Sequence, residues 1–88
     1  MTISNSNQSG TPVLLFASYA DAFGARTVHV PVSAPCRARA LVDALRSMSG
    51  GARLPVVPLL AVNQRWVDLD AVVQPGDEVA LIPPVAGG

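Results

Sequence analysis

Residues 77–88 read Asp77-Glu78-Val79-Ala80-Leu81-Ile82-Pro83-Pro84-Val85-Ala86-Gly87-Gly88. An apolar, strand-like run, Val79–Ile82, ends at two prolines, which fix φ and favour an extended chain. The two glycines after them are the most permissive backbone units. We therefore expect a last strand that feeds a flexible tail, Pro83–Gly88, whose terminal carboxylate projects away from the domain. The alternative is an ordinary frayed chain end made of small residues.

The segments before this strand predict a hairpin and a turn. Leu59–Val62 and Arg65–Val67 are short apolar strands, the second at a sheet edge, and Asn63-Gln64 between them predicts a tight turn because Asn tolerates positive φ. Gln74–Asp77 carries proline and glycine at the two central positions of a type II turn. Asp68–Val73 is expected to be a connector.

The middle of the chain predicts one long helix, from Ser33 or Ala34 to about Met48, with Pro35 near its first turn. Arg39 and Asp43 face away from the core and are spaced to form a weak ion pair. Gly50-Gly51 is expected to end the helix. Its apolar stripe has helical spacing and consists of Leu41, Ala44, Leu45 and Met48.

The first third of the chain predicts two strands and a short helix. Met1–Thr11 is polar and is interpreted as a disordered leader. Val13–Ala17 is an apolar run typical of a buried strand, and Thr27–Val30 is a second, alternating strand. Ser18–Phe23 predicts a helical turn that stops at Gly24. The expected fold class is α+β, with one main helix packed on a small mixed sheet.

The composition of the chain limits the classes of function that we expect. The chain has 88 residues, 50% hydrophobic and 14% charged, and six arginines balance six acids. That size fits one domain, and without a basic stripe we expect no nucleic-acid binding. No apolar segment is long enough to span a bilayer and no signal-type n-region is present, so we expect a cytoplasmic protein without membrane contact. An uncharged, apolar-rich protein is prone to associate with a partner.

The internal residues offer no conventional active site. His29 and Cys36 are the only histidine and cysteine, so neither a disulfide nor a zinc site can form within the chain. His29 is interpreted as structural, and Cys36 as a helix-face residue rather than a reactive thiol near a helix N-terminus. Asp68 and Asp70 are interpreted as solvated turn residues. Trp66 is assigned to core packing or sheet covering in preference to a binding role.

The carboxylate of Gly88 is then the most distinctive functional group. A carboxylate is a poor electrophile and must be activated, most simply as a mixed anhydride with a nucleotide. Attack by a sulfur donor gives a thiocarboxylate, whereas attack by a lysine gives an isopeptide conjugate. The chain contains no lysine and cannot form lysine-linked polymers of itself, which favours a carrier over a polymerising tag.

Two motifs, Gly76–Ala80 and Pro83–Gly88, resemble the C-terminal signature of the small, sulfur-carrying subunit of molybdopterin synthase. Weaker matches are Leu14–Ala17 and Ala61–Asn63. The chain departs from that family at Ala20-Asp21, where the family often has Arg-Glu. The resemblance implies a ubiquitin-like β-grasp fold. The chain is then expected to have three parts, namely a leader (1–11) outside the resemblance, a β-grasp domain (12–82) and a flexible Gly-Gly tail (83–88).

The resemblance also implies a reaction and partners. A ubiquitin-activating-like adenylyltransferase would use ATP to adenylate Gly88, and a sulfur donor would convert it to a thiocarboxylate. The large synthase subunit would form a heterotetramer with this chain, supply the catalytic lysine and pass the sulfur to cyclic pyranopterin monophosphate to make the dithiolene. No cofactor or metal is expected on this chain itself. The residues entering the large subunit would be Pro83, Pro84, Val85, Ala86 and Gly87.

Two alternative functions stay open at this stage. Related carriers with the same Gly-Gly end serve cysteine and thiazole synthesis, so the sulfur has more than one possible destination. A ubiquitin-like binding module, with an incidental tail, is the alternative from a different class. Removal of Gly87 and Gly88 separates a carrier from such a module, because only a carrier needs the terminal carboxylate.

Overall fold

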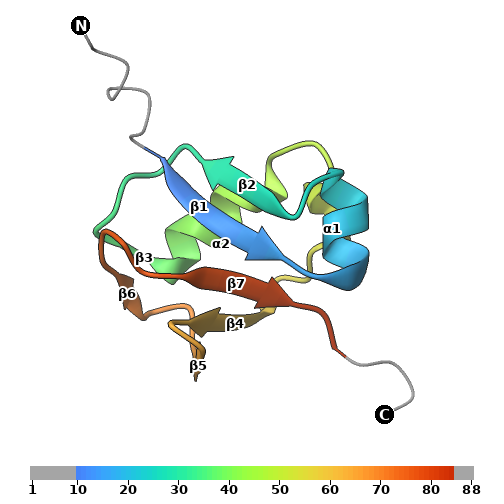
Figure 1. Cartoon of the computed structure of the whole chain (residues 1–88). Helices are drawn as coiled ribbons and strands as arrows, with labels where there is room; N and C mark the ends of the chain where they lie inside the picture. Colours follow the sequence, from blue (N-terminus) through green and yellow to red (C-terminus); the bar gives the residue numbers. More distant parts are fainter. Residues whose placement is uncertain (1–9, 85–88) are drawn as a thin grey trace, which may run out of the picture.

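The computed structural model describes residues 10–84. A five-stranded sheet runs in the order β2-β1-β7-β4-β5. The central strands β1 and β7 are parallel and every other neighbouring pair is antiparallel, so the predicted mixed sheet is confirmed (Figure 1). The strands are β1 (Thr11–Leu15), β2 (Thr27–Val30), β4 (Leu59–Val62), β5 (Arg65–Val67) and β7 (Val79–Ile82).

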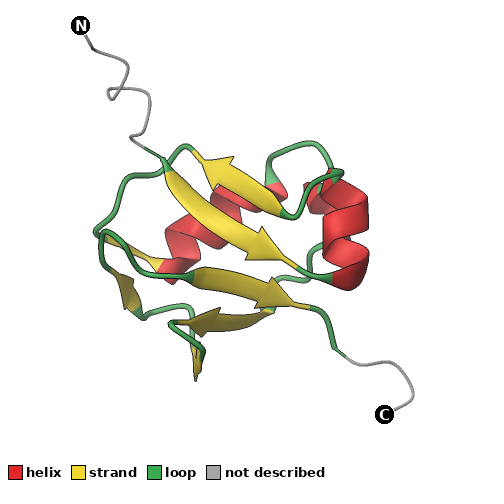
Figure 2. Ribbon diagram, viewed as in Figure 1, coloured by secondary structure: helices red, strands yellow, loops and turns green. Residues whose placement is uncertain are grey.

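The main helix, α2 (Ala38–Arg46), covers one face of this sheet (Figure 2). Its stripe is wider than predicted, because Ala38 and Val42 are buried together with the expected Leu41 and Leu45. Period-two alternation turns every second residue of a strand toward the helix. The buried core that results combines the helix face with sheet residues that include Val13, Leu15, Val30, Leu60, Val79 and Leu81.

The first strand begins and ends earlier than the apolar run predicts. Thr11, which we had assigned to the leader, is buried in β1, and its Oγ1 donates a hydrogen bond of 2.6 Å to the carbonyl oxygen of Val32. At the other end Phe16 leaves the sheet and Ala17 begins α1 (Ala17–Phe23). The prediction of a strand through Ala17 was therefore wrong by two residues. Residues 1–9 of the expected leader lie outside the described residues.

The short helix α1 ends as predicted. Gly24 has φ 72°, a left-handed conformation that glycine adopts without a Cβ penalty. Its N–H donates to the carbonyl oxygens of Ala20 at 2.8 Å and Asp21 at 3.3 Å. These bonds satisfy acceptors at the end of the helix and turn the chain back into β2.

The predicted start of the main helix was wrong by about four residues. Cys36–Arg37 forms the short strand β3, which pairs antiparallel with β6 (Val72–Val73) inside the expected connector. Helix α2 begins only at Ala38, because the first two helical N–H groups donate to that connector. The N–H of Ala38 bonds the carbonyl oxygen of Ala71 at 2.8 Å, and that of Arg39 bonds Leu69 at 2.9 Å.

Arg39 also has a different partner from the one predicted. Its Nη2 lies 2.6 Å from Oδ1 of Asp70 and not at Asp43. Arg37 donates from Nη1 to the Asp70 carbonyl oxygen at 2.7 Å, and Asp68 Oδ1 accepts the Asp70 N–H at 2.9 Å. Asp68 and Asp70 are exposed as expected, and they hold the connector against the start of α2.

Two closely packed glycines, Gly50 and Gly51, follow the end of α2. The helix ends at Arg46, two residues before the predicted end, and a 3₁₀ turn, η2 (Gly51–Arg53), follows. Gly50 has φ 94°. A Cβ placed on Gly51 would lie 2.1 Å from the carbonyl oxygen of Leu45, so only glycine fits there.

Both predicted turns are present. Asn63 and Gln64 have φ of 53° and 68° and close the β4–β5 hairpin. Gly76 has φ 88°, and the N–H of Asp77 donates to the carbonyl oxygen of Gln74 at 3.1 Å. Across residues 10–84, no helix has the length and apolar character that crossing a membrane requires.

Candidate functional site

The central strand of the sheet, β7, is also the last strand of the chain and leads to the predicted site residues. Along β7, Leu81 pairs with Leu15 of β1 and Ile82 pairs with Leu59 of β4. Pro83, which is half-buried, and Pro84, which is exposed, follow directly. Prolines have no N–H to extend the ladder, so strand pairing stops at Ile82. The remaining predicted site residues, Val85, Ala86, Gly87 and Gly88, lie outside the described residues.

The start of β7 is held by the β4–β5 hairpin. Nδ2 of Asn63 donates to Oδ1 of Asp77 at 3.0 Å, and the N–H of Glu78 donates to Oδ1 of Asn63 at the same distance. The N–H of Asn63 donates to the Glu78 carbonyl oxygen at 2.7 Å. Oδ2 of Asp77 accepts the N–H of Gln74 at 2.8 Å. These bonds fix the register of the strand whose other end carries the tail.

The hydrogen bonds to Asp77 also alter its acidity. The Asn63 amide and then the backbone N–H of Gln74 stabilise the charged carboxylate, and together they lower the pKa of Asp77. Asp77 caps the Gln74–Asp77 turn through its bond to the Gln74 N–H. The bond to Asn63 was missed, because sequence spacing does not show that the two turns meet.

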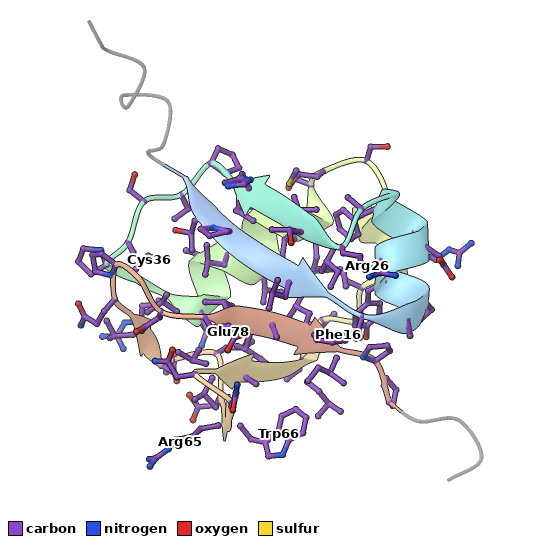
Figure 3. The ribbon with its side chains drawn as sticks, in the orientation of Figure 1. Phe16, Arg26, Cys36, Arg65, Trp66 and Glu78 are labelled. Atoms are coloured by element: carbon purple, nitrogen blue, oxygen red, sulfur yellow. The ribbon has the colours of Figure 1, made fainter. Side chains whose placement is uncertain are left out.

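The interpretation of Trp66 as a core residue was wrong. Its side chain is 66% exposed on the edge strand β5, where Trp66 pairs with Ala61 of β4 (Figure 3). Phe16 and Leu59 are also about half exposed, at 47% and 48%. The apolar run that contains Phe16 had predicted a buried strand residue. The exposure of these side chains could have been anticipated only by knowing which sheet face the helix covers.

The polar candidates lie on strands other than β7. His29 is exposed on β2, opposite Pro12. Cys36 lies half-buried in β3 opposite Val73, and burial raises the pKa of its thiol, which disfavours the reactive thiolate. Within residues 10–84, no three His, Cys, Asp or Glu side chains gather closely enough to hold a metal ion. Neither residue is brought to the end of β7.

Comparison with known proteins finds relatives over most of the chain. The sequence model of the ThiS family matches residues 13–88. The human molybdopterin synthase sulfur carrier subunit is 36% identical over 80 residues, which cover 86% of this chain and 91% of that protein.

Solved structures share the fold. SAMP1 from Haloferax volcanii, the small archaeal modifier protein 1, has a TM-score of 0.72 at 30% identity, covering 88% of this chain and 97% of that one. The complex of subunits 1 and 2 of the molybdopterin-converting factor from Helicobacter pylori contains a chain with a TM-score of 0.64 at 24% identity, covering 88% and 96%. The α+β class and the β-grasp fold are thereby confirmed.

Proposed function

Because the chain belongs to the ThiS family, we propose that it is a sulfur carrier that reacts through the C-terminal carboxylate of Gly88. The observation that carries this function is the match to a molybdopterin synthase sulfur carrier subunit over 86% of the chain. The protein acts as the small, sulfur-donating subunit of that synthase. It has no self-contained active site, and the chemistry is completed by partner proteins.

The reaction begins with activation of the carboxylate. A carboxylate oxygen of Gly88 attacks the α-phosphorus of ATP on an activating adenylyltransferase, and pyrophosphate leaves. Sulfide supplied by a donor then attacks the acyl carbon, AMP leaves, and a thiocarboxylate remains on Gly88. The thiocarboxylate sulfur forms a carbon–sulfur bond to the pterin precursor while an oxygen substituent leaves that carbon, and water then cleaves the acyl–sulfur bond. Sulfur stays on the precursor as part of the dithiolene, and the Gly88 carboxylate is regenerated.

The tail sets the reach of this carboxylate. Six residues, Pro83 to Gly88, follow the last paired residue. A fully extended chain of that length spans at most about 20 Å. The two prolines favour the extended form, and the glycines place no side chain beside the reacting carbon. Pro83 to Gly87 would therefore occupy a narrow channel in the partner protein, with Gly88 at the end of that channel.

Two partners follow from this chemistry. One is the large subunit of the synthase, and its support is the name of the human relative together with the two-subunit complex from Helicobacter pylori. The other is a ubiquitin-activating-like adenylyltransferase, which uses ATP. We place both encounters in the cytoplasm and assign the synthase two small and two large subunits.

The decisive experiment for carrier chemistry is an intact-mass measurement. The protein is mixed with ATP, the activating enzyme and a sulfur source, and a variant lacking Gly87 and Gly88 serves as the control. The wild type should gain the mass expected when one oxygen is replaced by sulfur. A wild type that never gains sulfur under conditions that thiolate a known carrier refutes the proposal.

A second assay identifies the destination of the sulfur. The thiocarboxylated protein is supplied to a synthase large subunit and its pterin precursor, or to the enzymes of cysteine or thiazole synthesis. Only a synthase subunit should yield molybdopterin. If only the cysteine or thiazole enzymes give product, the chain is a sulfur carrier for those pathways instead.

A modifier role is the second candidate, because SAMP1 shares the fold and carries that name. The same acyl adenylate can be captured by a lysine of another protein instead of by sulfur. This chain has no lysine, so its side chains offer no acceptor for lysine-linked polymers of itself. Larger conjugates with other proteins in the presence of ATP and the activating enzyme would favour that role.

A further inference from the structure

The five-stranded sheet has two free edges. Strand β2 forms one border and pairs only with β1, and β5 forms the other border and pairs only with β4 (Figure 1). A free edge offers unpaired backbone N–H and C=O groups to a strand of another chain. Proteins commonly protect such an edge with charged side chains, prolines or a very short strand.

The hydrogen bonds between β1 and β2 show which backbone groups face outward. The N–H of Leu15 donates to the carbonyl oxygen of Arg26 at 2.8 Å, so these two residues form a hydrogen-bonded pair. Such pairs alternate along an antiparallel ladder, and the next one joins Val28 to β1. The N–H and C=O groups of Thr27 and His29 therefore point away from the sheet, and both residues are exposed.

The edge at β2 lacks the usual protection. Its four residues, Thr27–Val30, include no proline and no charged side chain at pH 7, where histidine is counted as neutral. Strand β5 has three residues and begins at the charged Arg65. Its register in the hairpin turns only the backbone groups of Trp66 outward. An added strand therefore forms more hydrogen bonds at β2 than at β5.

A second copy of the chain fits this edge because the pattern of outward groups is self-complementary. We consider two β2 strands placed antiparallel, with Val28 opposite Val28 of the other copy. Thr27 then lies opposite His29 of the other copy on both sides of the two-fold axis. Each of these residue pairs exchanges two N–H···O bonds. The Thr27 hydroxyl also lies beside the His29 imidazole, which makes a polar cross-strand pair.

Neither the charges nor the tails oppose this pairing. Arg26 would lie opposite Val30 of the other copy, so the two guanidinium groups stand at opposite ends of the paired segment. The chain has no formal net charge, and two copies therefore do not repel each other at long range. Because β1 separates β2 from β7, the point at which each tail begins, Pro83, stays clear of the contact.

We propose that the chain forms a two-fold dimer in which β2 pairs with β2 of the other copy, so that two five-stranded sheets join into one. The same surface is used on both copies, and the assembly therefore closes after two chains. A contact made by four-residue strands is small, so the dimer is weak and reversible. The pairing goes beyond the sulfur-carrier function and does not depend on it.

Sedimentation equilibrium of the full chain tests the dimer at up to about 1 mM protein, where weak association is populated. His29→Pro should weaken association at least about tenfold, because it removes one outward N–H from each copy. No hydrogen bond within the sheet uses that N–H, so the variant should keep its fold. His29→Gln is the matched control. It keeps the N–H and an uncharged polar side chain, and should stay within about threefold of the wild type.

A second blocking variant leaves the backbone unchanged. His29→Lys places two like charges beside the two-fold axis, as edge strands that resist pairing do, and should also weaken association. Melting temperatures measured on dilute protein should agree with that of the wild type to within a few degrees. Association that is unchanged in both folded variants, His29→Pro and His29→Lys, overturns the proposal.

Hydrogen exchange of single backbone amides distinguishes this edge from any other contact surface. In dilute protein the amides of Thr27 and His29 should exchange rapidly, whereas those of Val28 and Val30 are protected by their bonds to β1. Raising the protein concentration should protect Thr27 and His29. A chain that stays monomeric at about 1 mM, or that dimerises without this protection, overturns the proposal.

Two further outcomes separate the dimer from other uses of the edge and from the sulfur-carrier function. Protection of Thr27 and His29 that appears only when the synthase subunit is added to a monomeric chain assigns the edge to that partner and overturns the proposal. A chain lacking Gly87 and Gly88 should dimerise like the wild type, and His29→Pro should still take up sulfur. Failure of sulfur uptake in the wild type therefore leaves the dimer in place.

Discussion

Asn63 and Asp77 are joined by a 3.0 Å hydrogen bond from Nδ2 to Oδ1, although fourteen residues separate them. Asn63 belongs to one motif of the family resemblance, Ala61–Asn63, and Asp77 to another, Gly76–Ala80. The structure shows that the two motifs form one unit. The hairpin turn after β4 bonds the turn before β7, and the strand that carries the tail starts from that junction.

Removal of the Asn63 side chain should therefore loosen the start of β7. We expect Asn63→Ala to lower the melting temperature by a few degrees, because the Asp77 carboxylate and the Glu78 N–H both lose a partner. Thermal unfolding followed by circular dichroism measures the change. Gln74→Ala is the control, because it shortens an exposed side chain and keeps the backbone N–H that bonds Asp77. Equal losses in the two variants would contradict the role of Asn63.

The acid sensitivity of the fold depends on Asp77 and Asp70. Hydrogen bonds lower the pKa of Asp77, and Arg39 lowers the pKa of Asp70, so both folded pKa values lie below the unfolded ones. The stability that they contribute is present above the unfolded value and is lost as pH falls through the folded one, below about pH 4. Unfolding in urea across that range should show a shallower decline for Asp77→Asn. An unchanged slope would count against this interpretation.

The close packing of Gly51 predicts that a side chain added there destabilises the fold more than one added at Gly24. A Cβ on Gly51 would lie 2.1 Å from the Leu45 carbonyl oxygen, whereas at Gly24 nothing lies within 4 Å and only φ 72° opposes a side chain. Gly24→Ala should cost about 1–2 kcal/mol, the penalty of a left-handed conformation. Gly51→Ala should destabilise the fold more, because backbone must move. Chemical denaturation measures both, and a smaller loss at Gly51 would disprove the clash.

Sequence patterns predicted the strands whose limits are set locally. Thr27–Val30, Leu59–Val62, Arg65–Val67 and Val79–Ile82 have the predicted bounds. Each has a proline, a tight turn or both beside it, and those residues act through their own φ preferences. The Gln74–Asp77 turn was predictable for the same reason, since Pro75 and Gly76 determine it within four residues.

The errors concern contacts between distant segments. Pro35 resembled a first-turn helix residue, but Cys36–Arg37 pairs with Val72–Val73, and a two-residue strand has no periodicity to detect. Trp66 was assigned to core packing or sheet covering, because large aromatics are usually well buried. Its exposure depends on which sheet face α2 covers, and that is a property of the assembled sheet. The site residues Pro83 to Gly88 came from the sequence motif, and the structure adds the strand that presents the first two.

The most direct test of the sulfur-carrier role uses a peculiarity of the sequence. The sulfur-containing residues are Met1, Cys36 and Met48, and the last site for trypsin is Arg65, so the peptide Trp66–Gly88 contains no sulfur. After reaction with ATP, activating enzyme and isotopically labelled sulfide, the protein is digested and this peptide is analysed by tandem mass spectrometry. We expect one labelled sulfur on the terminal residue, Gly88. Label confined to peptides with Cys36, and none on Trp66–Gly88, would contradict it.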